Sequence, residues 1–155
     1  MQMSDILNPE GVKLISQVSS KKRLFHDLGE LAEDAMGLCA ATVIEALQDR
    51  EALGPTGVGH GVALPHARLS GVEKVSGVFV RLERPIEFDS VDRQPVDLIF
   101  ALFAPEDAGV EHLKALALVS RTMRDAAICG KLRANKDIAA LHALLTDAQA
   151  ASKAA

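Results

Sequence analysis

Several residue types that often signal special structure or chemistry are scarce or absent in this sequence of 155 residues. There is no tryptophan or tyrosine and there are only 5 phenylalanines, so aliphatic side chains must build most of the core. The two cysteines, Cys39 and Cys129, are too few for a disulfide framework or a zinc site. We expect both to be small, buried apolar residues.

Long apolar runs and an excess of positive charge are also missing. No run approaches the roughly 20 apolar residues of a membrane-spanning helix, and the first residues lack the basic and apolar regions of a signal peptide. We therefore expect a cytoplasmic protein that is not inserted into a membrane. The formal net charge of -4 argues against nucleic acid or an anionic membrane surface as a partner.

What remains is the composition of an ordinary globular protein. Hydrophobic residues make up 48% and charged residues 25% of the chain, which excludes a disordered chain. The length suits one domain with a sizeable core. We predict a single domain over residues 1–155, with a core at about residues 6–146 and a frayed, alanine-rich tail at 148–155.

Hydrophobic periodicity predicts strands and helices along the chain. Strands are expected at residues 12–18, 75–82 and 96–103, with Arg84-Pro85 ending the second, and helices at 24–36, 40–51, 110–123 and 138–145, with a short helix after Asp125. Ser19 or Ser20 can cap the first helix and Gly37 can end it. We expect Leu113, Leu116, Ala117 and Met123 to form the core face of helix 110–123. The apolar segment 96–103 is typical of a central strand covered on both faces, so we predict an α/β sandwich with a central sheet and helices on both faces.

The segment of residues 56–68 contains the most unusual pattern. Gly57, Gly59 and Gly61 alternate, so in an extended chain one face would carry no side chains and would allow close approach by a partner. Pro65 has no N–H, so regular strand pairing should end near it. His66 would then lie at a strand end on a stiff stretch of backbone, which suits a reactive imidazole.

Two segments carry a resemblance to a known family: residues 54–66, Gly-Pro-Thr-Gly-Val-Gly-His-Gly-Val-Ala-Leu-Pro-His, and residues 94–105, Gln-Pro-Val-Asp-Leu-Ile-Phe-Ala-Leu-Phe-Ala-Pro. Together with about residues 6–146 they resemble the phosphotransferase-system enzyme IIA domains of the fructose/mannitol class, nitrogen-regulatory branch. The resemblance implies a mixed sheet and a histidine phosphocarrier, which is a phosphotransferase component and not a free-standing turnover enzyme. It also implies that an HPr-like phosphohistidine carrier donates the phosphoryl group.

Residue by residue, the resemblance makes His66 the phosphorylated nucleophile, through its Nε2 atom, and His112 a second active-site histidine. It makes Arg50 the active-site arginine, whose guanidinium fork suits a phosphate. Arg68 is a weaker candidate for the phosphate side. His60 stands where sugar-transporting relatives commonly have glutamate, which favours the regulatory branch. From the residues alone, each could instead be structural: a strand-end histidine, a helix-start histidine or a helix-end arginine.

Other functions stay open from the sequence. The soluble IIA component of a fructose- or mannitol-type permease is the main alternative, although no IIB or IIC segment is attached. The glycines match neither a Walker loop nor a dinucleotide-binding fingerprint, and no cofactor is expected. A metal-dependent hydrolase using His60, His66 and His112 matches no standard zinc spacing. A binding module that is never phosphorylated is the last alternative.

Overall fold

The computed structural model describes the backbone of residues 1–154 and the side chains of residues 1–147. A six-stranded sheet forms its centre, with the strand order β1-β5-β6-β3-β2 and with β4 also paired to β6. The strands are β1 (Leu7–Ile15), β2 (Gly57–Gly59), β3 (Val62–Ala63), β4 (His66–Leu69), β5 (Ser76–Ile86) and β6 (Val96–Pro105). β5 and β6 are antiparallel, whereas β1 runs parallel to β5, and β3 and β4 run parallel to β6. The sheet is therefore mixed, as predicted.

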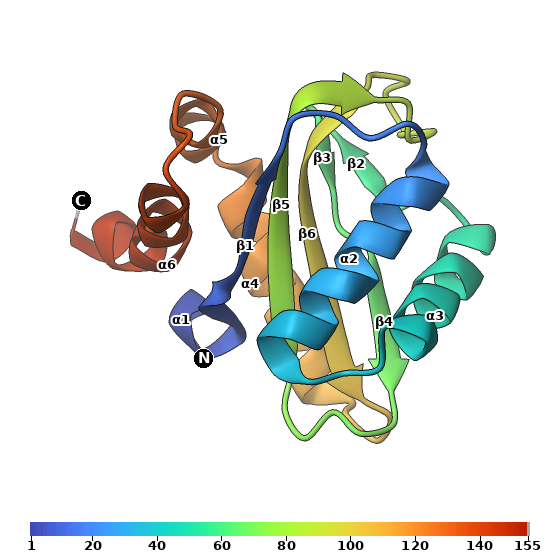
Figure 1. Ribbon diagram of the computed structural model, residues 1–155. Helices are drawn as coiled ribbons and strands as arrows, with labels where there is room; N and C mark the ends of the chain where they lie inside the picture. The colour runs from blue at the N-terminus through green and yellow to red at the C-terminus, as the bar shows by residue number, and fades with distance from the viewer. Residues whose placement is uncertain (155) are drawn as a thin grey trace.

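Helices cover both faces of this sheet (Figure 1). One face carries α2 (Lys21–Met36) and α3 (Ala40–Ala52), and the other carries α1 (Met3–Ile6), α4 (Val110–Arg124), α5 (Ala126–Arg133) and α6 (Ile138–Ala154). Two hydrophobic clusters, one under each helical layer, make up the core. β6 contributes to both, because consecutive buried residues point to opposite faces. The predicted α/β sandwich with a central strand at 96–103 is confirmed.

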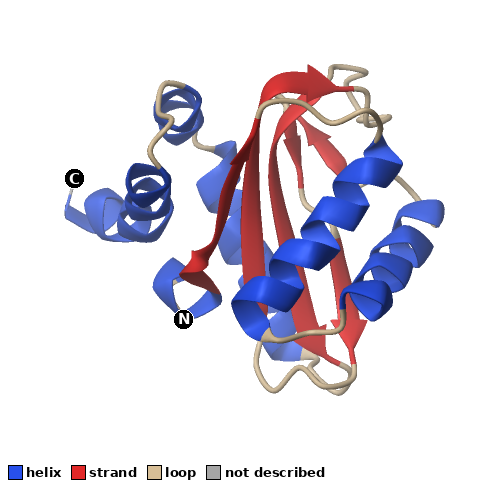
Figure 2. Cartoon of the chain, viewed as in Figure 1, coloured by secondary structure: helices blue, strands red, loops and turns tan. Residues whose placement is uncertain are grey.

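Most helix boundaries follow the predicted signals (Figure 2). The Ser20 side chain accepts a hydrogen bond from the backbone N–H of Arg23 at the start of α2. Gly37 ends this helix in the left-handed conformation, with a φ of 72°. The Asp125 carboxylate accepts from two backbone N–H groups at the start of α5. α6 extends to Ala154, residue 155 lies outside the described residues, and the fraying of the tail stays a prediction.

Three predictions about local structure are wrong. β5 continues through Pro85 to Ile86, because the pairing with β6 shifts register after Arg81 and so tolerates a residue without an N–H. Leu113 is 65% exposed and Ala117 is also exposed. α4 instead buries His112, Ala115, Leu118, Val119, Thr122 and Met123. Cys129 is buried as expected, but Cys39 is exposed at the N-cap of α3.

Candidate functional site

An open hollow of about 450 Å³ lies where α3, β4 and the start of α4 meet. It is lined by Ala46, Asp49, Arg50, Leu53, His66, Ala67, Arg68 and His112. The fold thus brings together four of the five predicted site residues from three separate parts of the chain. Leu53, at the rim, is 86% exposed.

His66 begins β4, where it is opposite Leu102 of β6, so it starts a strand and does not end one as predicted. The backbone N–H of Leu102 donates to the Pro65 carbonyl at 2.9 Å, which fixes the chain just before the histidine. The Nδ1 atom of His66 lies 2.9 Å from the carbonyl oxygen of Leu64. A carbonyl can only accept, so Nδ1 carries the proton and the neutral ring presents a free lone pair on Nε2.

His112 lies beside His66, with ring centroids 5.7 Å apart and ring planes at 68°. It is 7% exposed, and its Nδ1 accepts a hydrogen bond of 3.2 Å from Nε of Arg68. Its buried Nε2 has no hydrogen-bond partner among the residues that the structure describes. Burial, and then the charges of His66 and Arg68, hold the pKa of His112 below its ordinary value of 6.5. At neutral pH this imidazole is therefore uncharged.

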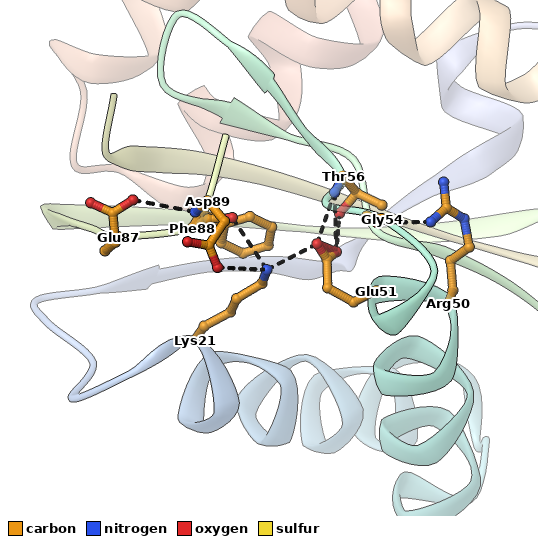
Figure 3. Close-up of polar contacts among 8 residues, drawn as sticks. All are labelled: Lys21, Arg50, Glu51, Gly54, Thr56, Glu87, Phe88 and Asp89. Atoms are coloured by element: carbon orange, nitrogen blue, oxygen red, sulfur yellow. Dashed lines mark hydrogen bonds and ion pairs between the residues drawn. The ribbon is translucent and has the colours of Figure 1, made fainter. Parts of the chain in front are cut away.

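Arg50 enters the hollow from the last turn of α3. Its Nη1 donates to the carbonyl oxygen of Gly54 at 2.9 Å, which anchors one edge of the guanidinium (Figure 3). Within residues 1–147, neither Arg50 nor Arg68 pairs with a carboxylate. Two guanidinium groups that form no ion pair within this part of the chain favour an anion in the hollow.

Behind Arg50, the carboxylate of Glu51 organises the loop that follows α3 (Figure 3). It accepts hydrogen bonds from the backbone N–H of Thr56, at 2.8 Å, and from the Thr56 hydroxyl. It also pairs with Nζ of Lys21 at 3.0 Å. Lys21 in turn donates to the Phe88 carbonyl and lies 4.4 Å above the Phe88 ring. These contacts hold the loop whose Gly54 carbonyl binds Arg50.

Sequence reasoning missed this network, although one local signal was available. A carboxylate in the last turn of a helix is unfavourable against the helix dipole, so Glu51 needs compensating partners. Its partners Lys21 and Phe88 come from distant parts of the chain, and no periodic pattern indicates them.

His60 does not lie in the hollow, which corrects its predicted place beside the phosphate. β2 and β3 form an antiparallel hairpin, with His60 at its turn at a φ of 57° and Gly61 at 79°. The N–H of His60 donates to the Asp92 carboxylate at 2.9 Å, and its carbonyl accepts from Arg133 at 2.8 Å. In β3, Val62 is opposite Leu98, whereas His66 is opposite Leu102. The hairpin therefore lies about 13 Å from His66, towards the N-terminal end of β6.

The same hairpin corrects the expected bare glycine face. Gly61 lies in the turn and not in line with Gly57 and Gly59. A Cβ atom on Gly57 would lie 2.2 Å from the Ser90 hydroxyl oxygen, and one on Gly61 would lie 2.5 Å from the guanidinium of Arg133. These glycines therefore serve chain reversal and close packing at this end of the sheet.

Among residues 1–147, no three histidine, cysteine, aspartate or glutamate side chains gather closely enough to hold a metal ion. In the same part of the chain, no helix has the length and apolar character needed to cross a membrane.

The mixed sheet with a helical layer on each face matches a known class of protein. Residues 5–148 match the family described as phosphoenolpyruvate-dependent sugar phosphotransferase system, EIIA 2, and the chain belongs to this family. Its members are components of a phosphoryl-transfer system, and the resemblance noted from the sequence is confirmed.

Within the family, the chain is homologous to nitrogen regulatory proteins. The nitrogen regulatory protein of Bradyrhizobium diazoefficiens is 47% identical over 145 residues, covering 94% of this chain and 95% of that protein. The nitrogen regulatory protein of Escherichia coli K12 is 41% identical over 150 residues, covering 96% and 92%. The crystal structure of nitrogen regulatory protein IIA-Ntr from Neisseria meningitidis superposes with a TM-score of 0.86 at 40% identity, covering 93% of this chain and 99% of that one.

Proposed function

We propose that the protein is a cytoplasmic histidine phosphocarrier that accepts a phosphoryl group on Nε2 of His66 and acts in nitrogen or metabolic regulation. The observation that carries the proposal is the hydrogen bond from Nδ1 of His66 to the Leu64 carbonyl. It leaves Nε2 unprotonated at the edge of an open hollow, which is the state of a nucleophilic imidazole. Membership of the phosphotransferase family and the homology to nitrogen regulatory proteins support this choice.

The reaction is a reversible exchange of one P–N bond for another. The Nε2 lone pair of His66 attacks the phosphorus of a phosphohistidine on an HPr-like carrier protein. The P–N bond of the carrier breaks, and the electron pair of that bond returns to the carrier's ring nitrogen. The proton on Nδ1 of His66 stays on that nitrogen, hydrogen-bonded to the Leu64 carbonyl, so the exchange needs no change of oxidation state and no additional base.

Phosphoryl transfer depends on positioning and on stabilising charge on the phosphoryl oxygens. Arg50 offers its guanidinium fork while Gly54 holds it from behind. His112 offers the N–H of its Nε2, a buried donor that has no acceptor in the described residues. An unpaired buried donor costs free energy, and a phosphoryl oxygen on His66 would supply the acceptor.

Labelling from a phosphohistidine carrier tests the proposal. The intact protein, incubated with such a carrier and phosphoenolpyruvate-driven donor enzymes, should gain one acid-labile, base-stable phosphoryl group by mass spectrometry. His66→Ala should gain none while keeping the wild-type circular dichroism spectrum, and His26→Ala, on α2, should label as wild type. A labelled His66→Ala variant would remove His66 from the role. Testing carriers of the regulatory and sugar-transport types in parallel separates regulation from a permease component.

A further inference from the structure

Arg68 and His112 form a contact that the transfer reaction itself does not require. Arg68 follows His66 by two positions in β4, so both side chains leave the strand on the same side. The Nε–H of Arg68 donates to Nδ1 of His112, on α4, at 3.2 Å. Because arginine has no acceptor and stays protonated, Nδ1 must hold a lone pair and the ring proton must be on Nε2.

This contact also opposes protonation of His112. An imidazolium would carry a proton on Nδ1, facing an arginine N–H, so the contact would have to break. The other charged or titratable groups that line the hollow are His66 from β4 and Asp49 and Arg50 from α3. Glu111, which precedes His112 in α4, is exposed and pairs with Lys114 at 3.8 Å. Burial lowers the pKa of His112 in the same direction.

Within residues 1–147, the side chain of Arg68 makes no hydrogen bond or ion pair other than the one with His112. Its side chain is exposed, and within residues 1–147 it has no carboxylate partner. The pairing of β4 with β6 is made by backbone groups and does not depend on this side chain. The described contact of its guanidinium is therefore with the second histidine of the site.

We propose, building on the phosphocarrier function above, that Arg68 is a positioning residue that holds His112 as the neutral tautomer with its proton on Nε2. Its effect on transfer passes through His112, whose N–H then faces the phosphoryl group on His66. Arg50, by contrast, binds the phosphoryl oxygens directly. The two arginines of the hollow thus have different tasks.

The first test uses the unphosphorylated protein and does not depend on the reaction. NMR titration of ¹⁵N-labelled imidazoles reports the tautomer and the pKa of His112. In Arg68→Met, which keeps the length and loses the donor and charge, the pKa of His112 should rise towards its ordinary value. Arg68→Lys should give an intermediate value, and Arg121→Met, at the exposed end of α4, should match wild type. A His112 titration unchanged in Arg68→Met would overturn the proposal.

The second test is a double-mutant cycle on the transfer rate from a phosphohistidine carrier. Arg68→Met alone should slow transfer about tenfold, the lower end of what a hydrogen bond to a charged group contributes. In the His112→Ala background the same substitution should have no further effect, because Arg68 acts through the missing ring. An equal loss in both backgrounds would mean that Arg68 binds the phosphate itself and would overturn the positioning role. If wild type accepts no phosphoryl group, the phosphocarrier function fails, while the titration still reports on the contact.

Discussion

Both ends of β6 lie close to histidine and arginine residues, but the arginines at the two ends have different hydrogen-bond and ion-pair partners. Near Leu98, the guanidinium of Arg133 makes hydrogen bonds of 2.9 Å from both Nε and Nη2 to the Asp97 carboxylate, and Nη2 also donates to the His60 carbonyl. Near Leu102, Arg50 bonds one carbonyl and Arg68 bonds one imidazole, and neither meets a carboxylate within residues 1–147. Both ends thus bring a histidine close to an arginine, but within residues 1–147 Arg133 pairs with a carboxylate whereas Arg50 and Arg68 do not.

That difference fits a structural role for Arg133 and the phosphate-binding role proposed for Arg50. The hydrogen bond to Asp97 raises the pKa of Arg133, and the carboxylate offsets the positive charge of the guanidinium. Through its bond to the His60 carbonyl, this arginine of α5 fastens the β2–β3 hairpin to that helix. At the other end, the Nε2–H of His112 and the guanidinium groups of Arg50 and Arg68 line the open hollow, and within residues 1–147 the first has no hydrogen-bond partner and the other two form no ion pair. Buried polar groups are normally satisfied. Within residues 1–147 the exceptions are Nε of Arg81, Oγ of Ser90 and Nε2 of His112, and the last of these lies next to His66.

The largest effect after loss of His66 should come from Arg50→Lys. A lysine keeps the charge but loses the planar fork, so transfer from the carrier should slow by about 10- to 100-fold, the equivalent of about 1.5–3 kcal/mol. Rapid-quench kinetics with labelled carrier measures this rate. The matched control is Arg133→Lys at the other end of β6, which should transfer at the wild-type rate. Equal slowing in both variants would contradict the contrast between the two ends.

The next effect concerns the support behind Arg50. Glu51→Gln keeps the shape but loses one acceptor oxygen and the charge that Lys21 pairs with. We expect a loss of about 1–3 kcal/mol in the free energy of unfolding, because Thr56 and Lys21 lose a partly buried acceptor. Urea denaturation measures it. Transfer should slow less than in Arg50→Lys, since the guanidinium itself remains. A Glu51→Gln variant as stable as wild type would show that this network does not stabilise the fold.

The sequence could predict the site only as far as local signals reach. Pro65 marks a break in strand pairing, as predicted, but pairing resumes at His66, which begins β4 and does not end a strand. The capping residues Ser20, Gly37 and Asp125 place helix ends, because each acts on its own neighbours. The β2–β3 hairpin was not predicted, because alternating glycines are compatible with both an extended strand and a turn. Which of the two forms depends on Asp92 and Arg133, which are distant in the sequence.

The face of α4 was mispredicted for a related reason. Apolar residues surround this helix, so periodicity alone allows more than one buried face. In the folded protein Leu113 is 65% exposed while His112 is 7% exposed, because the helix turns its histidine towards His66. Burying a polar ring in place of a leucine breaks the local pattern, and such breaks concentrate at functional sites.

A smaller effect is expected at the far end of β6. Asp97→Asn removes the charge that pairs with Arg133, and the pair is partly exposed, with 17% and 36% of the two side chains accessible. The free energy of unfolding should fall by about 1 kcal/mol, the upper end for exposed pairs. Thermal unfolding measures this loss, and added salt should reduce the difference from wild type. The phosphoryl-transfer rate should not change, and slower transfer would mean that the two ends of β6 are coupled.

The smallest effect is the dependence of stability on pH through His112. Its pKa in the folded protein lies below the ordinary value of 6.5, so the unfolded chain takes up this proton first as the pH falls. Above that value both states are neutral and the contribution to stability is complete; it is lost as the pH drops towards the folded pKa. His112→Gln does not titrate, so its free energy of unfolding should fall less steeply than that of wild type between about pH 7 and pH 5. Urea denaturation at a series of pH values measures both slopes, with His26→Gln as the matched control. Parallel slopes in His112→Gln and wild type would mean that His112 titrates alike in the folded and unfolded states, and the hollow would then lack the neutral donor that distinguishes it from the other end of β6.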